Sequence, residues 1–265
     1  MPRPIQVTYK VAATASEVAR TAADCFLGAV IVAVNTRGLA RVAISGGSTP
    51  KAMFALLADP AQPFLAQVPW SKLELFFVDE RCVPPDNPES NFLMTTQAML
   101  SKVPLPAAQV HRMEGELDPE VAAARYESTI RNVFKLEGAE TPTFDLILLG
   151  MGDDGHTASL FPHTEGLDNL TNIVIANHVP QKDTWRITLT WPVINQGRHV
   201  AFLIEGAAKT DVLYNVLLGP YQPETYPSQL IRPASGKLTL LLDNVAAAKL
   251  PPPDVSTQTG TLELK

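Results

Sequence analysis

Short apolar runs alternate with amphipathic stretches along most of the chain, and the two patterns predict strands and helices in turn. Strands are predicted at residues 41–44, 73–78, 145–149, 173–176, 186–190, 199–204 and 238–242. Helices are predicted at residues 15–37, 51–58, about 91–100, 120–136 and 209–218, with an Ala-rich helical turn ending near residue 250. Because strands alternate with helices and are continuously apolar, we predict a Rossmann-like α/β fold, doubly wound, with a mainly parallel sheet and helices on both faces.

Local signals indicate where two of these helices begin or end. Thr14 and Glu17 have the spacing of a capping box, and Gly38 provides a left-handed stop for the same helix. At the next helix, Thr49 is predicted as the N-cap and Pro50 as the first helical residue.

Composition limits the class of protein. The chain has 265 residues, 46% of them apolar and 18% charged, which is enough for a sizeable core and excludes intrinsic disorder. No repeat or interdomain linker is visible. We therefore predict one α/β catalytic domain at residues 1–250 and a flexible C-terminal tail at residues 251–265.

Charge and cysteine content narrow the set of partners. A net charge of -6 argues against nucleic acid and anionic membranes as partners. The longest apolar stretch, residues 25–34, is too short to cross a bilayer, and the first residues lack the apolar core of a signal peptide. Cys25 and Cys82 lie far apart and form no metal-binding spacing. We expect a cytoplasmic protein, a monomer or small homo-oligomer, whose partner is a small molecule.

Polar or glycine-rich clusters follow three of the predicted strands. They occupy residues 45–49, 79–81 and 150–156. In doubly wound folds, ligands bind beyond the carboxyl ends of the strands. If the sheet is parallel, the three clusters converge on one site.

The first cluster, SGGSTP, has the features of an anion site. Gly46 and Gly47 let a ligand approach the backbone, a helix start supplies free N–H groups, and Ser48 and Thr49 add hydroxyls. An ordinary well-capped turn between strand and helix explains the same residues equally well. The patterns of a P-loop and of GxGxxG are both missing.

The second cluster is Asp79-Glu80-Arg81. A carboxylate such as that of Asp79 can bind sugar hydroxyls, and Arg81 can bind phosphate or a developing oxyanion. A surface ion pair is the simpler interpretation of such a triplet. Its position after a buried strand favours a functional role.

The third cluster, GMGDDGHTASLFP at residues 150–162, contains the strongest candidate for catalysis. A histidine side chain has the chemistry of a general base, so His156 can take this role, and Asp154 can orient it or favour its charged form. The segment is predicted to open a helix, and a capping histidine in a tight turn is the alternative. His156 and His163 lack a third ligand, so no metal site is predicted.

Two further cations begin predicted elements that can face the same pocket. Arg186 begins a strand and Lys209 begins a helix. Both are candidate substrate ligands, although most such side chains are only solvated.

Together these residues resemble a known family. SGGSTP, DERCVPPDNPESN and GMGDDGHTASLFP, in this order and spacing, closely resemble the 6-phosphogluconolactonases, and RITLTWPVIN, GAAK and LLDNVAAA are similar to later parts of that family. The resemblance covers roughly residues 15–248. The piece GHTASLFP is its most specific part. The resemblance implies the fold that these enzymes share with glucosamine-6-phosphate deaminase and ribose-5-phosphate isomerase.

The resemblance implies hydrolysis of 6-phospho-D-glucono-1,5-lactone to 6-phospho-D-gluconate in the oxidative pentose phosphate pathway, without metal or organic cofactor. We hypothesise that His156 activates water and that Asp154 assists it. Arg81 or the N–H groups near Gly46 and Gly47 would then stabilise the oxyanion. The 6-phosphate would be held by Arg81, Arg186, Lys209 and the helix start at Ser48 and Thr49, in a division that the sequence leaves open.

Two other functions are considered. The related deaminases carry a glutamate five residues after the histidine, and Phe161 stands there in this chain, which argues against deamination. A sugar-phosphate sensor would usually carry a DNA-binding segment. We expect none, because the α/β pattern begins within about the first 15 residues.

Overall fold

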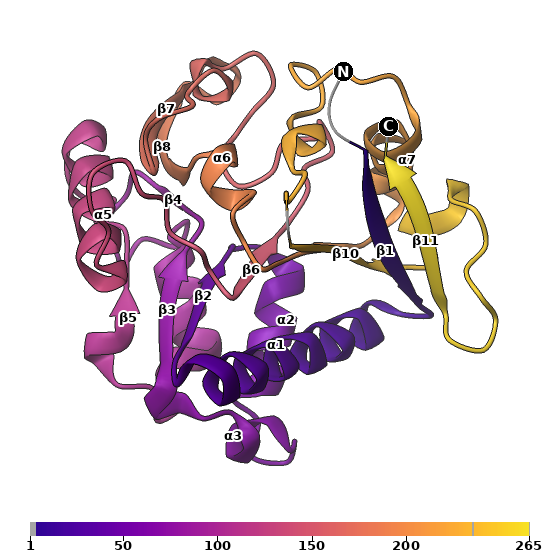
Figure 1. The fold of residues 1–265 in the computed structure, drawn as a ribbon, viewed down its shortest axis with the longest axis horizontal. Coiled ribbons are helices and arrows are strands. Elements are labelled where there is room, and N and C mark those ends of the chain that lie inside the picture. Colours follow the sequence, from indigo (N-terminus) through magenta and orange to yellow (C-terminus); the bar gives the residue numbers. More distant parts are fainter. Residues whose placement is uncertain (1–3, 235, 265) are drawn as a thin grey trace.

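A computed structural model describes residues 4–234 and 236–264 (Figure 1). The helices are α1 (Ala15–Arg37), α2 (Ser48–Leu57), α3 (Phe64–Gln67), α4 (Asn91–Thr95), α5 (Pro119–Phe134), α6 (Trp191–Ile194) and α7 (Thr210–Leu218). The strands are β1 (Ile5–Ala12), β2 (Ala40–Ile44), β3 (Leu73–Phe77), β4 (Asp79–Arg81), β5 (Val110–His111), β6 (Leu146–Leu149), β7 (Val174–Val179), β8 (Thr184–Leu189), β9 (His199–Ile204), β10 (Lys237–Asp243) and β11 (Thr259–Leu264). None of the helices in the described ranges combines the length and apolarity needed to cross a membrane.

The larger of two sheets has eight strands in the order β11-β1-β10-β9-β6-β2-β3-β5. All neighbouring pairs are parallel except β11 with β1. The predicted α/β class with a mainly parallel sheet is confirmed. This order brings the carboxyl ends of β9, β6, β2 and β3 side by side, and the last three of these ends precede the polar clusters.

Alternate residues of the central strands enter two separate cores, one on each face of the sheet. Val42 and Ile44 of β2 pack with the buried side chains of α1 and α2, whereas Ala43 packs with those of α5 and α7. Figure 1 shows α1 and α2 together on one face. The sheet is therefore buried on both sides, as its continuously apolar strands predict.

The first helix ends where the sequence predicts. The Thr14 side chain accepts a hydrogen bond from the Glu17 amide (3.3 Å), and Glu17 accepts one from the Ala13 amide (2.8 Å). Gly38 ends the helix with φ of 79°, a conformation that glycine adopts without the steric cost of a side chain. The second helix differs from the prediction, because it begins at Ser48 with Gly47 as its N-cap at φ 115°.

A second, smaller sheet contains two of the predicted strands and one strand that was not predicted. The strands β4, β8 and β7 form an antiparallel sheet of their own, so the predicted strands at 173–176 and 186–190 are confirmed, with slightly different bounds, as members of this sheet and not of the parallel one. The Asp79–Arg81 triplet is itself a strand of this sheet rather than a loop. Short strands with mixed polarity give no sequence signal for the sheet to which they belong.

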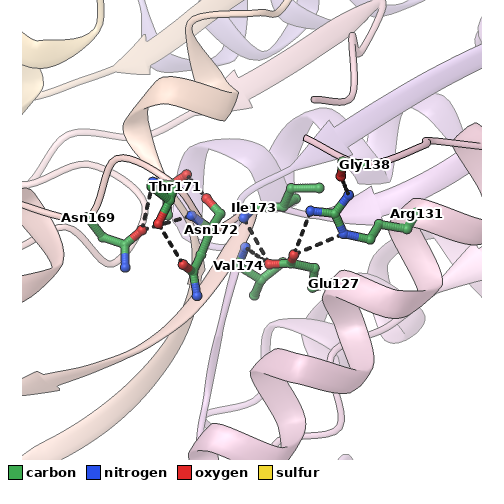
Figure 2. A network of polar contacts seen from close by, with 9 residues as sticks. Glu127, Arg131, Gly138, Asn169, Thr171, Asn172, Ile173 and Val174 are labelled. Carbon is green, nitrogen blue, oxygen red and sulfur yellow. Dashed lines mark hydrogen bonds and ion pairs between the residues drawn. The ribbon is translucent and has the colours of Figure 1, made fainter. Parts of the chain in front are cut away.

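Helix α5 anchors the small sheet through one carboxylate. Glu127 accepts hydrogen bonds from the backbone amides of Ile173 (2.9 Å) and Val174 (3.2 Å), at the start of β7 (Figure 2). Its other oxygen accepts a hydrogen bond from Arg131 (3.0 Å), which also donates to the Gly138 carbonyl. The position of β7, and through it of β8, therefore depends on this helix.

The C-terminal segment is not a flexible tail over residues 259–264. These residues form β11, which pairs with β1 along its length, and Leu264 is buried. Both strands alternate apolar and polar residues, the pattern of strands with one buried face, but neither was predicted. Gly260 is required at this edge, because a Cβ there would lie 2.0 Å from the Tyr9 ring.

One other local prediction was wrong, and one was confirmed with a change in the type of helix. The segment after His156 does not open a helix, since residues 150–162 form turns and an isolated bridge between Thr157 and Leu160. The predicted helix at 91–100 is α4 followed by a wider π-turn, in which the Ser101 amide bonds the Thr96 carbonyl.

Candidate active site

The three polar clusters meet at one cavity beyond the carboxyl ends of β2, β3, β6 and β9, so their predicted convergence is confirmed. The cavity has a volume of about 360 Å³, which is within the range of small-ligand sites. All predicted site residues except Asp154 line it, namely Gly46, Gly47, Ser48, Thr49, Asp79, Arg81, His156, Arg186 and Lys209. Asp154 contacts the site through His156.

The SGGSTP turn presents unpaired donors to this cavity. Within the described part of the chain, the backbone N–H groups of Gly47, Ser48 and Thr49 donate no hydrogen bond to protein atoms. They lie at the N-terminus of α2, a helix of ten residues without a side-chain cap. Consecutive free N–H groups at the positive end of a helix dipole attract anions.

The close approach of Asn91 leaves no room for a side chain at Gly46. A Cβ at this position would lie 1.8 Å from the Asn91 side-chain oxygen. The Asn91 amide nitrogen donates to the Asp79 carbonyl (2.9 Å), so Asn91 links the SGGSTP turn to the DER strand. A close approach of this kind tolerates only glycine.

Glu80 organises the DER cluster without lining the cavity. Its buried carboxylate accepts hydrogen bonds from the backbone amides of Arg81, Asn91 and Phe92, each at 2.8 Å, and from the Ser90 hydroxyl. Burial raises the pKa of Glu80, and the three amides partly offset that rise. Glu80 is thus a structural residue that holds the start of α4 against β4.

Asp79 connects the DER strand to the histidine loop. It is buried, and its carboxylate accepts a hydrogen bond from the Ser159 hydroxyl at 2.7 Å. The Ser159 amide in turn donates to the Thr188 hydroxyl on β8 (3.2 Å). The loop that carries His156 is therefore fastened to the small sheet.

His156 and Asp154 form a hydrogen-bonded pair. The Nδ1 atom of His156 lies 2.6 Å from the Asp154 carboxylate, which also accepts the His156 backbone N–H (3.0 Å). Burial raises the pKa of Asp154, but the hydrogen bond and charge of His156 outweigh it and lower the pKa to about 2. With Nδ1 engaged by a carboxylate, Nε2 is the nitrogen left to exchange a proton with a ligand.

Two close contacts fix the position of the imidazole ring. The ring stacks on Phe161, with centroids 4.0 Å apart and an interplanar angle of 24°. At Gly152, a Cβ would lie 2.1 Å from the His156 Nδ1 atom. The glycine and the phenyl ring together define one orientation of the histidine.

Arg81 and Arg186 are partners in register on β4 and β8. Arg81 donates to the Glu89 carbonyl, and Arg186 donates to the Thr184 hydroxyl (2.9 Å) and the Trp185 carbonyl (3.0 Å). Burial lowers the pKa of Arg186, and the charge of Arg81 lowers it further. Two adjacent guanidinium groups that share no carboxylate among the described ion pairs favour an anionic ligand.

Two charged residues of the cavity were missed by sequence reasoning. Lys182 lies in the turn between β7 and β8, with its Nζ atom 5.1 Å from the centre of the Phe161 ring. Glu205 follows β9, and one of its carboxylate oxygens is buried without a partner among the described residues. Burial raises the pKa of Glu205, a hydrogen bond from Thr49 lowers it, and the charge of Asp243 raises it. Only its position directly before the Gly206 turn could have indicated Glu205.

No group of three or more metal-ligating side chains comes together in the described ranges. The cavity therefore offers a histidine–carboxylate pair, two arginines, two lysines, the carboxylates of Asp79 and Glu205, and a set of free backbone amides. This combination can bind a phosphorylated polyol and assist proton transfer during a reaction at one of its carbons.

Known proteins share this fold and are similar to this chain in sequence. Residues 13–240 match the family described as glucosamine-6-phosphate isomerases/6-phosphogluconolactonase. A 6-phosphogluconolactonase from Synechocystis sp. is 41% identical over 232 residues, covering 86% of this chain and 92% of that protein. The structure of 6-phosphogluconolactonase from Trypanosoma cruzi superimposes with a TM-score of 0.80 at 31% identity, over 92% of this chain and 96% of the other. A monomeric glucosamine-6-phosphate deaminase, at 17% identity and a TM-score of 0.76, shares the fold.

Proposed function

Because this chain belongs to the glucosamine-6-phosphate isomerase/6-phosphogluconolactonase family, we propose that it hydrolyses 6-phospho-D-glucono-1,5-lactone to 6-phospho-D-gluconate, a step of the oxidative pentose phosphate pathway. The observation that carries the proposal is the His156–Asp154 pair at 2.6 Å with Phe161 stacked against it. A base is present, while the position that bears an acid in the related deaminases holds a phenyl ring.

His156 acts as the general base in this proposal. Its Nε2 atom takes a proton from water, and the water oxygen attacks the lactone carbonyl carbon to form a tetrahedral oxyanion. When the bond between that carbon and the ring oxygen breaks, the proton on His156 passes to the ring oxygen, which becomes the C5 hydroxyl. The Asp154 carboxylate, whose pKa is about 2, stays charged and stabilises the imidazolium in between.

In this proposal the cations and free amides of the cavity form two groups that divide the substrate between them. The free N–H groups at Ser48 and Thr49, with Lys209, receive the 6-phosphate. Arg81 and Arg186 face the lactone carbonyl, where negative charge develops and where the product carries its carboxylate. This assignment is supported by the Ser159 contacts, which bind the His156 loop to the strands that carry both arginines.

A coupled assay with freshly generated lactone tests the proposed function. We expect acid release well above spontaneous hydrolysis, and no ammonia from glucosamine 6-phosphate. Plain gluconolactone should show a kcat/KM lower by about 10²-fold or more, because it lacks the phosphate. Ammonia release without lactone hydrolysis would support the deaminase instead, and binding without turnover would support a sensor.

The proposed setting is the cytoplasm. Cys25 and Cys82 are both free thiols, as expected in a reducing compartment. We further propose that the enzyme is a monomer or a small homo-oligomer, which light scattering on the purified protein would determine.

A further inference from the structure

A second cavity lies between α1 and the strands β1, β10 and β9, with a volume of about 630 Å³. Its residues His199 and Lys237 begin β9 and β10, whereas the catalytic cavity lies beyond the other end of β9. Six strand residues separate the two positions, or roughly 20 Å. We call this cavity the α1 groove, and Figure 1 shows α1 lying across the face of the sheet that forms its floor.

The floor of the α1 groove is polar, although it lies on the face of the sheet that α1 covers. His199 is the register partner of Lys237, and Thr8 is the register partner of Thr239. The His199 Nε2 atom lies 3.0 Å from the Thr239 hydroxyl. Side chains at alternate positions share a face of a sheet, so these residues form two polar rows that lead up to the apolar Leu241.

Helix α1 contributes a wall of small residues. Cys25, Gly28, Ala29 and Val32 line the groove, and nothing lies within 4 Å of a Cβ placed at Gly28. The Cys25 sulfur lies 3.9 Å from the His199 Nδ1 atom. The helix thus leaves room beside the polar floor and does not pack onto it.

The groove carries an excess of positive charge in an acidic protein. Arg37 and Arg198 both contact the Asp145 carboxylate, at 2.7 and 3.4 Å. Lys10 and Lys237 have no ion-pair partner among the described residues, and Asp24 is the one other carboxylate on the lining. Both lysines affect the ionisation of His199. Burial, followed by the charges of Lys237 and Lys10, lowers the pKa of His199 to about 4. The two lysines also oppose the effect of burial on the Cys25 thiol.

We propose that the α1 groove binds a small organic anion of the phosphorylated sugar-acid class, with one of its two acidic groups at Lys10 and the other at Lys237. The lysines stand four residues apart along the strands and one strand apart across them, about 14 Å between their Cα atoms. That separation, with flexible side chains reaching inward, suits acidic groups at the two ends of a short chain. The hydroxyls of Thr8 and Thr239 and the imidazole of His199 offer hydrogen bonds to the hydroxyls between them.

Chemical footprinting of the two thiols tests this proposal on the intact protein. 6-Phosphogluconate is the probe, and the rate of Cys25 alkylation by neutral iodoacetamide is followed by peptide mass spectrometry. The alkylation rate of Cys82 is the internal control, because Cys82 lies beside Arg81 and outside the groove. We expect the probe to slow Cys25 alkylation saturably, by about fivefold or more.

Matched substitutions identify the residues responsible. Lys10→Met and Lys237→Met should each raise the half-protecting concentration by about tenfold, which is the expected loss of one charge-assisted contact. Lys72→Met, a control outside both cavities, should leave it unchanged. None of the three should alter lactone hydrolysis, so failure of this proposal is distinguishable from failure of the proposed function.

Burial raises the pKa of the Cys25 thiol to about 11, which slows its alkylation. A second measurement that does not depend on this thiol is therefore included. The His199 imidazole resonances should shift on titration with 6-phosphogluconate and stay unchanged in the Lys10→Met, Lys237→Met double variant. Absence of both protection and shift would overturn the proposal. Equal effects of inorganic phosphate and 6-phosphogluconate would do so as well, since they would indicate an adventitious ion only.

Discussion

The imidazole ring of His156 stacks on the phenyl ring of Phe161, at a centroid distance of 4.0 Å. Asp154 holds the Nδ1 atom of the same imidazole at 2.6 Å. One contact fixes the plane of the ring and the other fixes its rotation within that plane. Phe161 is therefore a positioning residue for the proposed base, as well as the residue that distinguishes this chain from the deaminases.

Replacing the phenyl ring should impair the reaction more than the fold. Phe161→Leu keeps the site apolar but removes the stack, a contact of about 0.5–1.5 kcal/mol, so kcat should fall by about 3–10-fold. Phe134→Leu is the control, because Phe134 packs edge-on against Phe144 away from the cavity, with ring centroids 4.9 Å apart. That variant should lose stability with kcat unchanged. An unaltered kcat in Phe161→Leu would mean that the ring does not position the base.

Removing the base should affect kcat by the amount typical of proton transfer. His156→Asn should lower kcat by about 10²–10⁴-fold, with the unfolding transition little changed. Asp154→Asn should lower it less, and the double variant should resemble His156→Asn, because the two residues act as a unit. Additive losses in the double variant would contradict a shared role.

The sequence predicted the parts of the fold that depend on local chemistry. The capping box at Thr14 and the stop at Gly38 involve residues close together in the chain, so their patterns are visible. The convergence of the three polar clusters followed from the parallel sheet, because equivalent strand ends share one edge.

What the sequence could not predict depends on contacts between distant segments. The strand at Asp79–Arg81 exists because it pairs with β8, more than a hundred residues later. Lys182 reaches the cavity through that same small sheet, and Glu205 through the neighbouring end of β9. The Thr259–Leu264 strand likewise needs β1 at its side. Its apolar residues alternate, but the pattern is too short to distinguish it from a tail.

Replacing one arginine of the Arg81–Arg186 pair should lower activity without lowering stability. In the free protein, burial and the charge of Arg81 both act against the charge of Arg186. Arg186→Met should therefore leave the midpoint of urea unfolding unchanged or raise it. It should still lower kcat/KM by about 10²-fold, because the oxyanion loses a donor. A large loss of stability would show that the guanidinium is structurally required.

Two glycines allow a matched test of the SGGSTP turn. Gly46→Ala should displace Asn91, whose side-chain oxygen would lie 1.8 Å from the new Cβ, and raise KM for the phosphorylated lactone. Gly28→Ala adds the same methyl group within α1, where nothing lies within 4 Å. It should raise the free energy of unfolding by about 0.5–1 kcal/mol and leave the kinetics unchanged. Equal KM values in the two variants would contradict the tight approach at Gly46.

His199 should make the fold sensitive to acid. Burial, with Lys237 and Lys10, lowers the pKa of His199 from its usual 6.5 to about 4. Between these values the unfolded chain binds a proton that the folded chain does not, so stability falls as the pH drops below 6.5 and the loss is complete near 4. The full loss is about 3 kcal/mol.

Urea unfolding of the wild type and His199→Gln, at about pH 7.5 and about pH 4.5, measures this effect. The drop in unfolding free energy between the two conditions should be smaller in His199→Gln by up to about 3 kcal/mol, because glutamine binds no proton in either state. Exposed His178 provides the control, and His178→Gln should reproduce the wild-type drop. If His199→Gln also reproduces it, the imidazole titrates freely in the folded protein and the two lysines do not act on it. In His199→Gln the α1 groove also lacks the imidazole whose resonances report ligand binding. The acid test and the test of anion binding therefore share one residue but have independent outcomes.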